Sequence, residues 1–149
     1  MSVFNIEIIA VGKLKQSSPF YTLYNDYVRR LNGKVKLVEI EAKSTQEEHQ
    51  KIAGKLNHNA ALVVLDERGK SIPSIEFAHK LETLQSSKGG TLQFVIGGAE
   101  GLNDQIRGQA DVLLSFGRQA WPHMLARVML IEQIYRAQQI LAKHPYHRE

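Results

Sequence analysis

The sequence contains no cysteine, only four prolines and no long hydrophobic run. Without cysteine the chain has no disulfide framework, no thiolate nucleophile and no zinc site built on sulfur. No apolar segment approaches the roughly 20 residues that a helix needs to span a bilayer. The N-terminus lacks the basic segment and cleavage site of a signal peptide, so it is expected to form a first strand. We therefore expect a cytoplasmic protein without a membrane partner.

The bulk composition is that of a folded protein. The chain has 149 residues, of which 43% are hydrophobic and 23% are charged, and this balance excludes a mainly disordered chain. Residues 1–149 contain no internal repeat or low-complexity linker, which predicts a single domain. The net charge of +4 is compatible with a polyanionic partner, although many soluble proteins carry a similar excess.

Five short apolar runs predict β-strands. They are Val3–Val11, Val35–Ile40, Ala61–Leu65, Leu92–Ile96 and Val112–Leu114. The last three are almost continuously apolar, which is typical of strands that are covered on both faces of a parallel sheet.

Between the strands, apolar residues recur at helical spacing. Helices are predicted over Pro19–Leu31, Thr45–Leu56 and Pro73–Leu84, and from Pro122 to about Lys143. Ser18 is the expected N-cap of the first helix, and Ser44 or Thr45 that of the second. The alternation of strands and helices predicts an α/β fold with parallel strand pairing and right-handed crossovers.

Three segments that follow predicted strands are candidates for one ligand crevice. In a parallel sheet ligands bind beyond the C-terminal strand ends, where the sequence places Asp66–Lys70, Gly97–Gly101 and Ser115–Trp121. The glycines of the second segment let the backbone approach a ligand closely, but a tight turn explains them equally well. Asn103 is the expected cap of a following helix.

The irregular loop before Pro122 offers backbone groups to a ligand. Its residues are Phe116, Gly117, Arg118, Gln119, Ala120 and Trp121. Backbone amides and carbonyls there suit hydrogen bonds to an adenine edge. Trp121 is also interpreted as a core or hinge residue, which is the more common role of a lone tryptophan.

The last predicted helix is apolar over most of its circumference. His123 and Arg127 share one side, whereas Glu132 and Arg136 lie nearly opposite. One sheet face cannot bury so wide a surface. The helix is therefore either fully internal or packed on another subunit, and the small size of the chain favours a homodimer.

The C-terminal residues His144–Glu149 combine imidazole, phenol and guanidinium groups. Arginine pairs with phosphate and aromatic rings stack on unpaired bases, so this mixture suits RNA. Chain ends usually fray, however, and a solvated tail is the simpler interpretation. His49, His58 and His79 are expected on polar, solvated helix faces. Because no HExxH or similar motif occurs, no metal site is predicted.

Taken together, residues along the whole chain resemble the ribosomal large-subunit RNA methyltransferase H family of the SPOUT class. The matching residues are Val11-Gly12-Lys13, Tyr27, Arg30, Leu65-Asp66, Gly69-Lys70, Ile96-Gly97-Gly98, Glu100-Gly101, Pro122-His123, Arg127, Leu130, Glu132-Gln133, Tyr135-Arg136-Ala137 and Tyr146-His147-Arg148. The resemblance implies a homodimeric, three-layer α/β knot with a parallel sheet and a trefoil-knotted C-terminal region. Sequence rules alone do not predict a knot, because knots are nearly absent from proteins.

The same resemblance implies an activity and its site. The activity is methylation of N3 of a pseudouridine in helix 69 of 23S ribosomal RNA on the assembled ribosome, with S-adenosylmethionine as methyl donor and with neither metal nor DNA involved. Donor-binding residues would be Leu65, Gly97, Phe116, Gly117, Arg118, Gln119, Ala120 and Trp121. Residues near the target base would be His123, Arg136, Tyr146, His147 and Arg148, the tail serving the partner subunit's donor. The sequence departs from the family pattern at Ala99, where proline is common, and in the loop at Gly117, Arg118 and Trp121.

Methyl transfer from a sulfonium requires that the methyl group be aligned with the attacking nitrogen N3 and that the N3 proton be removed. We expect Arg148 and His147 to position the base and stabilise its anion, while His147, His123 and water all remain candidate proton acceptors. Two rival functions are a non-enzymatic ribosome-binding factor and a small nucleotide- or flavin-binding protein.

Overall fold

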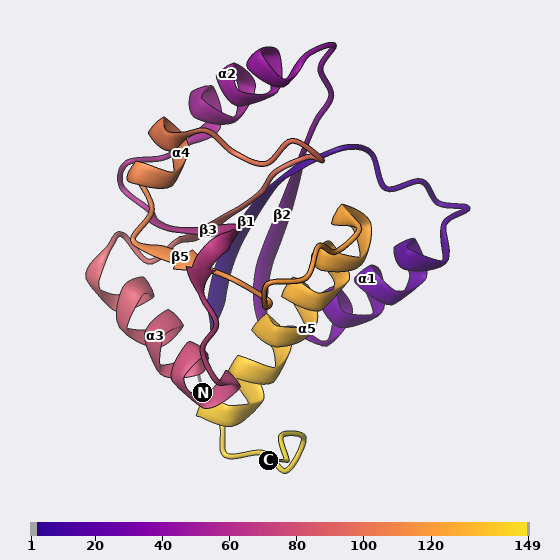
Figure 1. Ribbon diagram of the computed structural model, residues 1–149. Coiled ribbons are helices and arrows are strands. Elements are labelled where there is room, and N and C mark those ends of the chain that lie inside the picture. The colour runs from indigo at the N-terminus through magenta and orange to yellow at the C-terminus, as the bar shows by residue number, and fades with distance from the viewer. Residues whose placement is uncertain (1–2, 149) are drawn as a thin grey trace.

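The computed structural model describes residues 3–148 (Figure 1). Within this range the strands are β1 (Phe4–Val11), β2 (Gly33–Ile40), β3 (Ala61–Lys70), β4 (Leu92–Ile96) and β5 (Val112–Leu114), and the helices are α1 (Pro19–Arg30), α2 (Thr45–Lys55), α3 (Ser74–Ser87), α4 (Asp104–Gly108) and α5 (His123–Leu141). All strand pairs are parallel and form one sheet in the order β2-β1-β4-β3-β5. The predicted α/β class and parallel pairing are confirmed.

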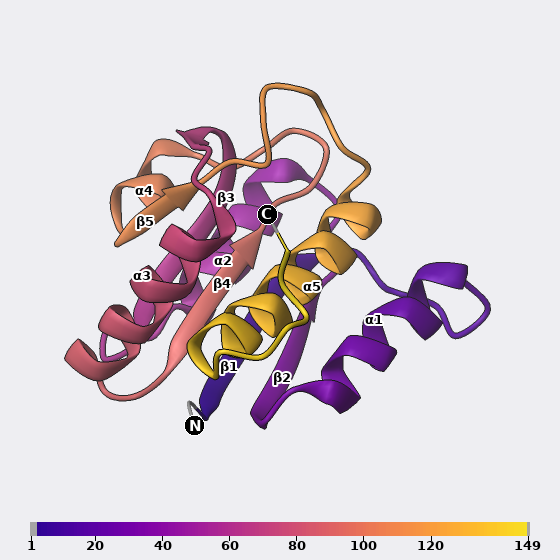
Figure 2. The same ribbon diagram turned by 90° about the horizontal axis from the view of Figure 1, so that it is seen from below.

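Helices cover both faces of the sheet, which gives three layers. Helices α1, α3 and α5 lie on one face, and α2 and α4 lie on the other (Figures 1 and 2). Side chains alternate along a strand, so Ile8 belongs to the core under α5 while Ile9 belongs to the core that contains Ile52 of α2 and Ile106 of α4. All five residues of the central strand β4 are buried, which explains why four of the five are apolar.

Side-chain caps fix three helix starts where the sequence predicts them. The Ser18 hydroxyl accepts a hydrogen bond from the Phe20 amide at 3.2 Å. Ser44, rather than Thr45, caps α2. The Asn103 side-chain oxygen accepts from the Ile106 amide at 3.0 Å. Each cap satisfies an amide that would otherwise lack a partner.

Strand β3 extends five residues beyond its apolar run, from Leu65 to Lys70. After an irregularity in the ladder, Lys70 pairs with Leu114, and the Ser115 amide donates to the Lys70 carbonyl at 2.9 Å. A Cβ at Gly69 would lie 2.5 Å from the Leu113 carbonyl oxygen, so this close approach requires glycine. The prediction that Asp66–Lys70 is a segment after the strand is wrong, because polar residues continue the pairing.

Asp111 joins the start of β5 to β3 and α3. Its carboxylate accepts from the Leu62 amide at 2.8 Å and contacts the Lys88 ammonium at 2.9 Å. Burial acts to raise the pKa of Asp111, but the hydrogen bond from Leu62 and the Lys88 charge outweigh it, so that the pKa lies below its ordinary value.

A partly buried ion pair anchors the start of α5 to the C-terminal ends of β1 and β2. The fully buried Arg127 guanidinium donates to the Glu39 carboxylate at 2.7 Å and to the Gly12 carbonyl at 3.2 Å. The Glu39 carboxylate also accepts from the Leu14 amide at 2.7 Å. Burial beside this pair raises the pKa of Tyr24 to about 12. Through these contacts α5 is fixed over the sheet edge where ligands bind in parallel sheets.

Within residues 3–148, no helix is both long enough and apolar enough to cross a membrane.

Candidate ligand site at the carboxyl edge of the sheet

A pocket of about 290 Å³ lies at the C-terminal ends of β4 and β5 and beside residues 65–68 within β3. This volume is just below the range of about 300–1,000 Å³ for small-molecule sites. The lining comes from residues 65–68, 96–102, 114–117, 119–121, 123 and 126. The expectation that three distant segments meet at this edge is therefore confirmed.

The segment after β4 needs its glycines for close packing as well as for a turn. A Cβ at Gly97 would lie 2.8 Å from the Cγ of Leu102, and one at Gly98 would lie 3.0 Å from a Glu48 carboxylate oxygen. Gly101 has a φ of +74°, and its amide donates to the Gly98 carbonyl at 3.0 Å. The segment is thus a tight turn that also lines the pocket, so the two interpretations of its glycines are compatible.

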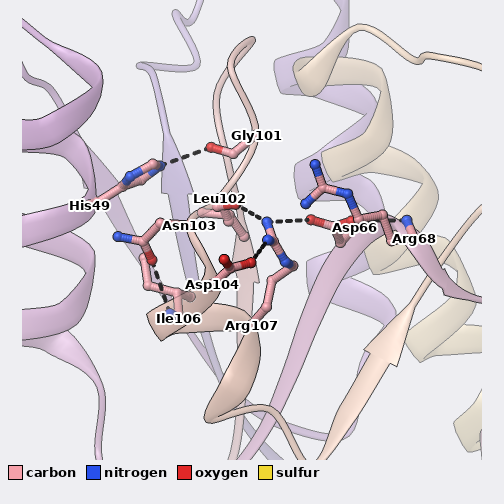
Figure 3. A network of polar contacts seen from close by, with 9 residues as sticks. All are labelled: His49, Asp66, Arg68, Gly101, Leu102, Asn103, Asp104, Ile106 and Arg107. Atoms are coloured by element: carbon pink, nitrogen blue, oxygen red, sulfur yellow. Dashed lines mark hydrogen bonds and ion pairs between the residues drawn. The ribbon is translucent and has the colours of Figure 1, made fainter.

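Polar contacts from three elements hold this turn (Figure 3). Nε2 of His49, on α2, lies 2.9 Å from the Gly101 carbonyl oxygen. A carbonyl only accepts, so Nε2 must donate. Arg107 of α4 contacts the Leu102 carbonyl and the Asp104 carboxylate. It also lies 3.7 Å from the carboxylate of Asp66, at the end of the apolar part of β3.

The structure corrects the predictions for two of the three histidines. His49 is half-buried and bound to the turn, so the prediction of a solvated side chain is wrong. His58 is exposed, but it lies in the turn after α2 rather than on a helix. His79 is exposed on α3, as predicted.

The loop after β5 is shaped by a buried serine. The Ser115 hydroxyl donates to the Gly117 carbonyl at 2.8 Å and accepts from the Gly117 amide at 3.0 Å. Gly117 has a φ of +106°, a conformation that favours glycine. Trp121 is 41% exposed, with its indole N–H directed to the Phe116 carbonyl at 3.3 Å. The interpretation of Trp121 as a core residue is wrong.

The predicted donor-binding residues are brought together with one exception. Leu65, Gly97, Phe116, Gly117, Gln119, Ala120 and Trp121 all line the pocket, whereas Arg118 does not. Asp66, Glu67, Arg68 and Glu100 also line it. They lie in the segments predicted to form the crevice, but they were not among the predicted donor-binding residues. Three of these four are carboxylates, of which Asp66 is already paired with Arg107. Their position directly after strand-ending apolar runs was the available signal.

Arg136, Tyr146 and His147 form a second group, which we term the tail cluster, near the C-terminal end of α5. Arg136 Nε donates to the Glu132 carboxylate at 2.9 Å. The Arg136 guanidinium lies 4.9 Å from the centre of the Tyr146 ring, and its Nη1 lies 3.1 Å from Nδ1 of His147. The interpretation of the whole tail as solvated is wrong for Tyr146 and His147, although Arg148 is exposed.

The electrostatics of the tail cluster keep its phenol neutral. Burial, a hydrogen bond with Tyr27 and the Glu132 charge raise the pKa of Tyr146 to about 12. The hydrogen bond to Glu132 also raises the pKa of Arg136. The Tyr146 ring meets Tyr135 edge-on at 4.8 Å between centres. The cluster thus holds the tail against α5 with a fixed positive charge at its centre.

Within one chain, the residues that are predicted to lie near the target base are not all close to one another. His123 lines the pocket, but Arg136, Tyr146, His147 and Arg148 do not. Arg136 lies more than three turns further along α5, about 20 Å away at a rise of about 1.5 Å per residue.

A groove of about 500 Å³ runs between α1, α3 and α5, next to the tail cluster. Leu23, which is 47% exposed, and Met129 are among its lining residues. Its lining from α5 consists of Val128, Met129, Glu132 and Gln133.

The described part of the chain contains no group of three or more His, Asp or Glu side chains that could hold a metal ion.

Comparisons with known proteins support a common origin over nearly the whole chain. A family model described as "Predicted SPOUT methyltransferase" matches residues 4–147. The chain is 44% identical over 148 residues to the ribosomal RNA large subunit methyltransferase H of Paramagnetospirillum magneticum, covering 95% of this chain and 97% of that protein. It is 45% identical, with the same coverage, to the protein of that name from Rhodospirillum centenum.

Two solved structures share the fold at low sequence identity. A probable methylase family protein from Haemophilus influenzae superposes with a TM-score of 0.57 at 14% identity, covering 94% of this chain and 67% of that one. The SpoU methyltransferase AviRb from Streptomyces viridochromogenes gives a TM-score of 0.51 at 11% identity, covering 94% and 61%.

Proposed function

Because the chain belongs to the ribosomal RNA large subunit methyltransferase H family of SPOUT methyltransferases, we propose that it transfers a methyl group from S-adenosylmethionine to N3 of a pseudouridine in helix 69 of 23S ribosomal RNA. The reaction takes place in the cytoplasm on the assembled ribosome. The observation that carries the proposal is the convergence of three backbone segments on one pocket that is rich in carboxylates.

The pocket suits the methyl donor in shape and charge. The loop at residues 116–121 offers backbone amides and carbonyls to the adenine edge. The turn at Gly97–Gly101 lets the backbone approach the ribose and methionine parts, since no Cβ intervenes at Gly97. Glu67 and Glu100 supply negative charge for the sulfonium and ammonium groups, and Arg68 supplies positive charge for the carboxylate. Asp66 is already paired with Arg107.

We further propose that the C-terminal region forms a trefoil knot and that two chains form a homodimer. Support for the dimer comes from the groove beside α5 and from the separation of His123 from the tail cluster. A second copy seated on the groove covers the remaining apolar side of α5. In such a dimer the tail of one subunit serves the donor pocket of the other.

The reaction balances without a metal. The nitrogen N3 attacks the methyl carbon, the bond between that carbon and sulfur breaks, and its electron pair stays on sulfur as a neutral thioether. The N3 proton passes to a base or to water. Arg148 and His147 position the target base, and positive charge beside it stabilises the imide anion that forms when N3 is deprotonated.

A tail deletion tests the proposal. Removing residues 146–149 is expected to leave S-adenosylmethionine binding unchanged while abolishing methylation of 23S RNA in isolated ribosomes. A net charge of +4 is too small for tight binding to free RNA, so a bare helix 69 hairpin is expected to be a poor substrate. Donor binding without methylation by the intact chain would favour a non-enzymatic ribosome-binding factor instead.

A further inference from the structure

The hydrogen bond between Arg136 and His147 determines which nitrogen of His147 carries the proton. Nη1 of Arg136 lies 3.1 Å from Nδ1 of His147. A guanidinium has only donors and stays charged in proteins. Nδ1 must therefore be the acceptor, and the neutral ring must carry its hydrogen on Nε2.

Arg136 is itself held in place, so this arrangement is not a chance contact of two mobile side chains. Glu132 accepts from Nε at 2.9 Å and from Nη2 at 3.3 Å. The Tyr146 ring lies over the guanidinium at 4.9 Å, and both partners in the Glu132–Arg136 pair are mostly buried. The only remaining terminal nitrogen, Nη1, is the one directed at His147.

Nε2 of His147 is buried and has no partner among residues 3–148. Buried N–H groups nearly always have an acceptor, because leaving one unpaired is costly. The missing acceptor is therefore expected from outside the described chain. The tail beyond α5 forms only turns, and the flanking His144 and Arg148 are exposed. An outside acceptor can reach the buried Nε2 only if this short segment moves.

We propose that His147 is a hydrogen-bond donor to the target base and not the base that removes the N3 proton. This role rests on the proposed methyltransferase function. Nε2–H donates to a carbonyl oxygen next to N3, where negative charge develops as the N3 proton leaves. In this tautomer only the lone pair of Nδ1 can accept a proton, and that lone pair already accepts a hydrogen bond from Arg136. The N3 proton therefore goes to another acceptor.

His123 differs from His147 because no protein group that the structure describes holds either of its ring nitrogens. It lines the donor pocket, and its ring has no hydrogen-bond partner in the described part of the chain. Its Nε2 packs beside Gly12, where a Cβ added to this glycine would lie 3.4 Å from the nitrogen. His123 and water are the acceptors that this geometry leaves for the proton.

Nitrogen NMR of the intact protein tests the tautomer directly. In ¹⁵N-labelled protein, at a pH at which the ring is neutral, correlation spectra of His147 are expected to show hydrogen on Nε2 and an unprotonated Nδ1. The variant Arg136→Met removes the donor to Nδ1 and is expected to give a mixture of tautomers. Hydrogen on Nδ1 in the wild-type protein would overturn the proposal.

A matched pair of substitutions tests the catalytic role. His147→Gln retains an N–H near the position of Nε2, whereas His147→Asn retains an acceptor for Arg136 but loses that N–H. In single-turnover methylation of ribosomes, we expect the Gln variant to stay within about 10-fold of wild type. The Asn variant is expected to lose about 100-fold or more, the usual effect of removing one donor to a developing anion. The pH–rate profile of the Gln variant should keep the wild-type shape.

Other outcomes separate the competing roles. Equal losses in both variants, with loss of the acidic limb of the pH–rate profile, would identify His147 as the base. Better activity for Asn than for Gln would indicate that His147 only supports the tail through Arg136. S-adenosylmethionine binding by each variant is the control for folding. If the wild-type protein itself transfers no methyl group, the proposed function fails, and the role of His147 fails with it.

Discussion

Gly97→Ala tests whether the turn after β4 is as tightly packed as the structure requires. Gly97 does not have a positive φ, so alanine causes no backbone strain there, and the cost is purely steric. The new Cβ would lie 2.8 Å from Cγ and 3.0 Å from Cδ2 of Leu102, a side chain that is only 5% exposed. Because Cγ is not the flexible end of that side chain, the turn itself must shift. Such overpacking costs about 1–3 kcal/mol.

Urea unfolding of Gly97→Ala and of a control, Gly54→Ala, measures this cost. A Cβ at Gly54, in α2, has nothing within 4 Å, so this variant is expected to gain about 0.5–1 kcal/mol from helix propensity. Calorimetry should also show weaker S-adenosylmethionine binding for Gly97→Ala and unchanged binding for Gly54→Ala. Wild-type stability and affinity in Gly97→Ala would refute the packing argument.

Further predictions concern the ion pair, a surface carboxylate and the tail. In urea unfolding, Arg127→Met is expected to lower the free energy of unfolding by about 2–4 kcal/mol. This loss is smaller than for a fully buried pair because the Glu39 side chain keeps some contact with solvent. Asp111→Asn is expected to cost about 1 kcal/mol at neutral pH. That difference should vanish as the pH falls through the lowered pKa of Asp111, since only the charged form gains from folding. Tyr27→Phe should lower the pKa of Tyr146 from about 12 towards 10, seen by ¹³C NMR of its phenol carbon; an unchanged pKa would contradict the Tyr27 hydrogen bond.

Local patterns in the sequence predict most of the elements because the physics that forms them is local. The run Leu92–Ile96 is fully buried, as its composition indicates. Asn103 caps α4 because its side chain reaches an amide three residues away. The position of the pocket was also predictable, since parallel strands all present their carboxyl ends at one edge.

Contacts between distant residues had no signal in the sequence pattern. The His49 contact with Gly101 joins residues 52 positions apart, and the Arg127 contact with Glu39 joins residues 88 positions apart. In both cases a polar residue on a helix finds its partner only through the order of strands in the sheet. The polar end of β3 at Lys70 was missed for a related reason, because the ladder continues by backbone pairing after the apolar run has ended.

The role of the tail follows from its local sequence pattern and from its contacts with distant residues together. Its aromatic and basic residues pointed to a role with RNA, but the packing of Tyr146 on Tyr135 and Arg136 depends on the chain folding back along α5. His123 and Arg136 lie on the same helix, and the rise of about 1.5 Å per residue places His123 far from the tail cluster. This separation is the structural reason to expect two subunits at each site.

Titration calorimetry of the intact protein with S-adenosylmethionine tests the central claim most directly. The account predicts saturable binding at one site per pocket, weakened by Gly97→Ala and unaffected by removal of residues 146–149. A folded protein that releases no binding heat at any temperature, and that shows no thermal stabilisation by the donor, would contradict the assignment of this pocket to the methyl donor.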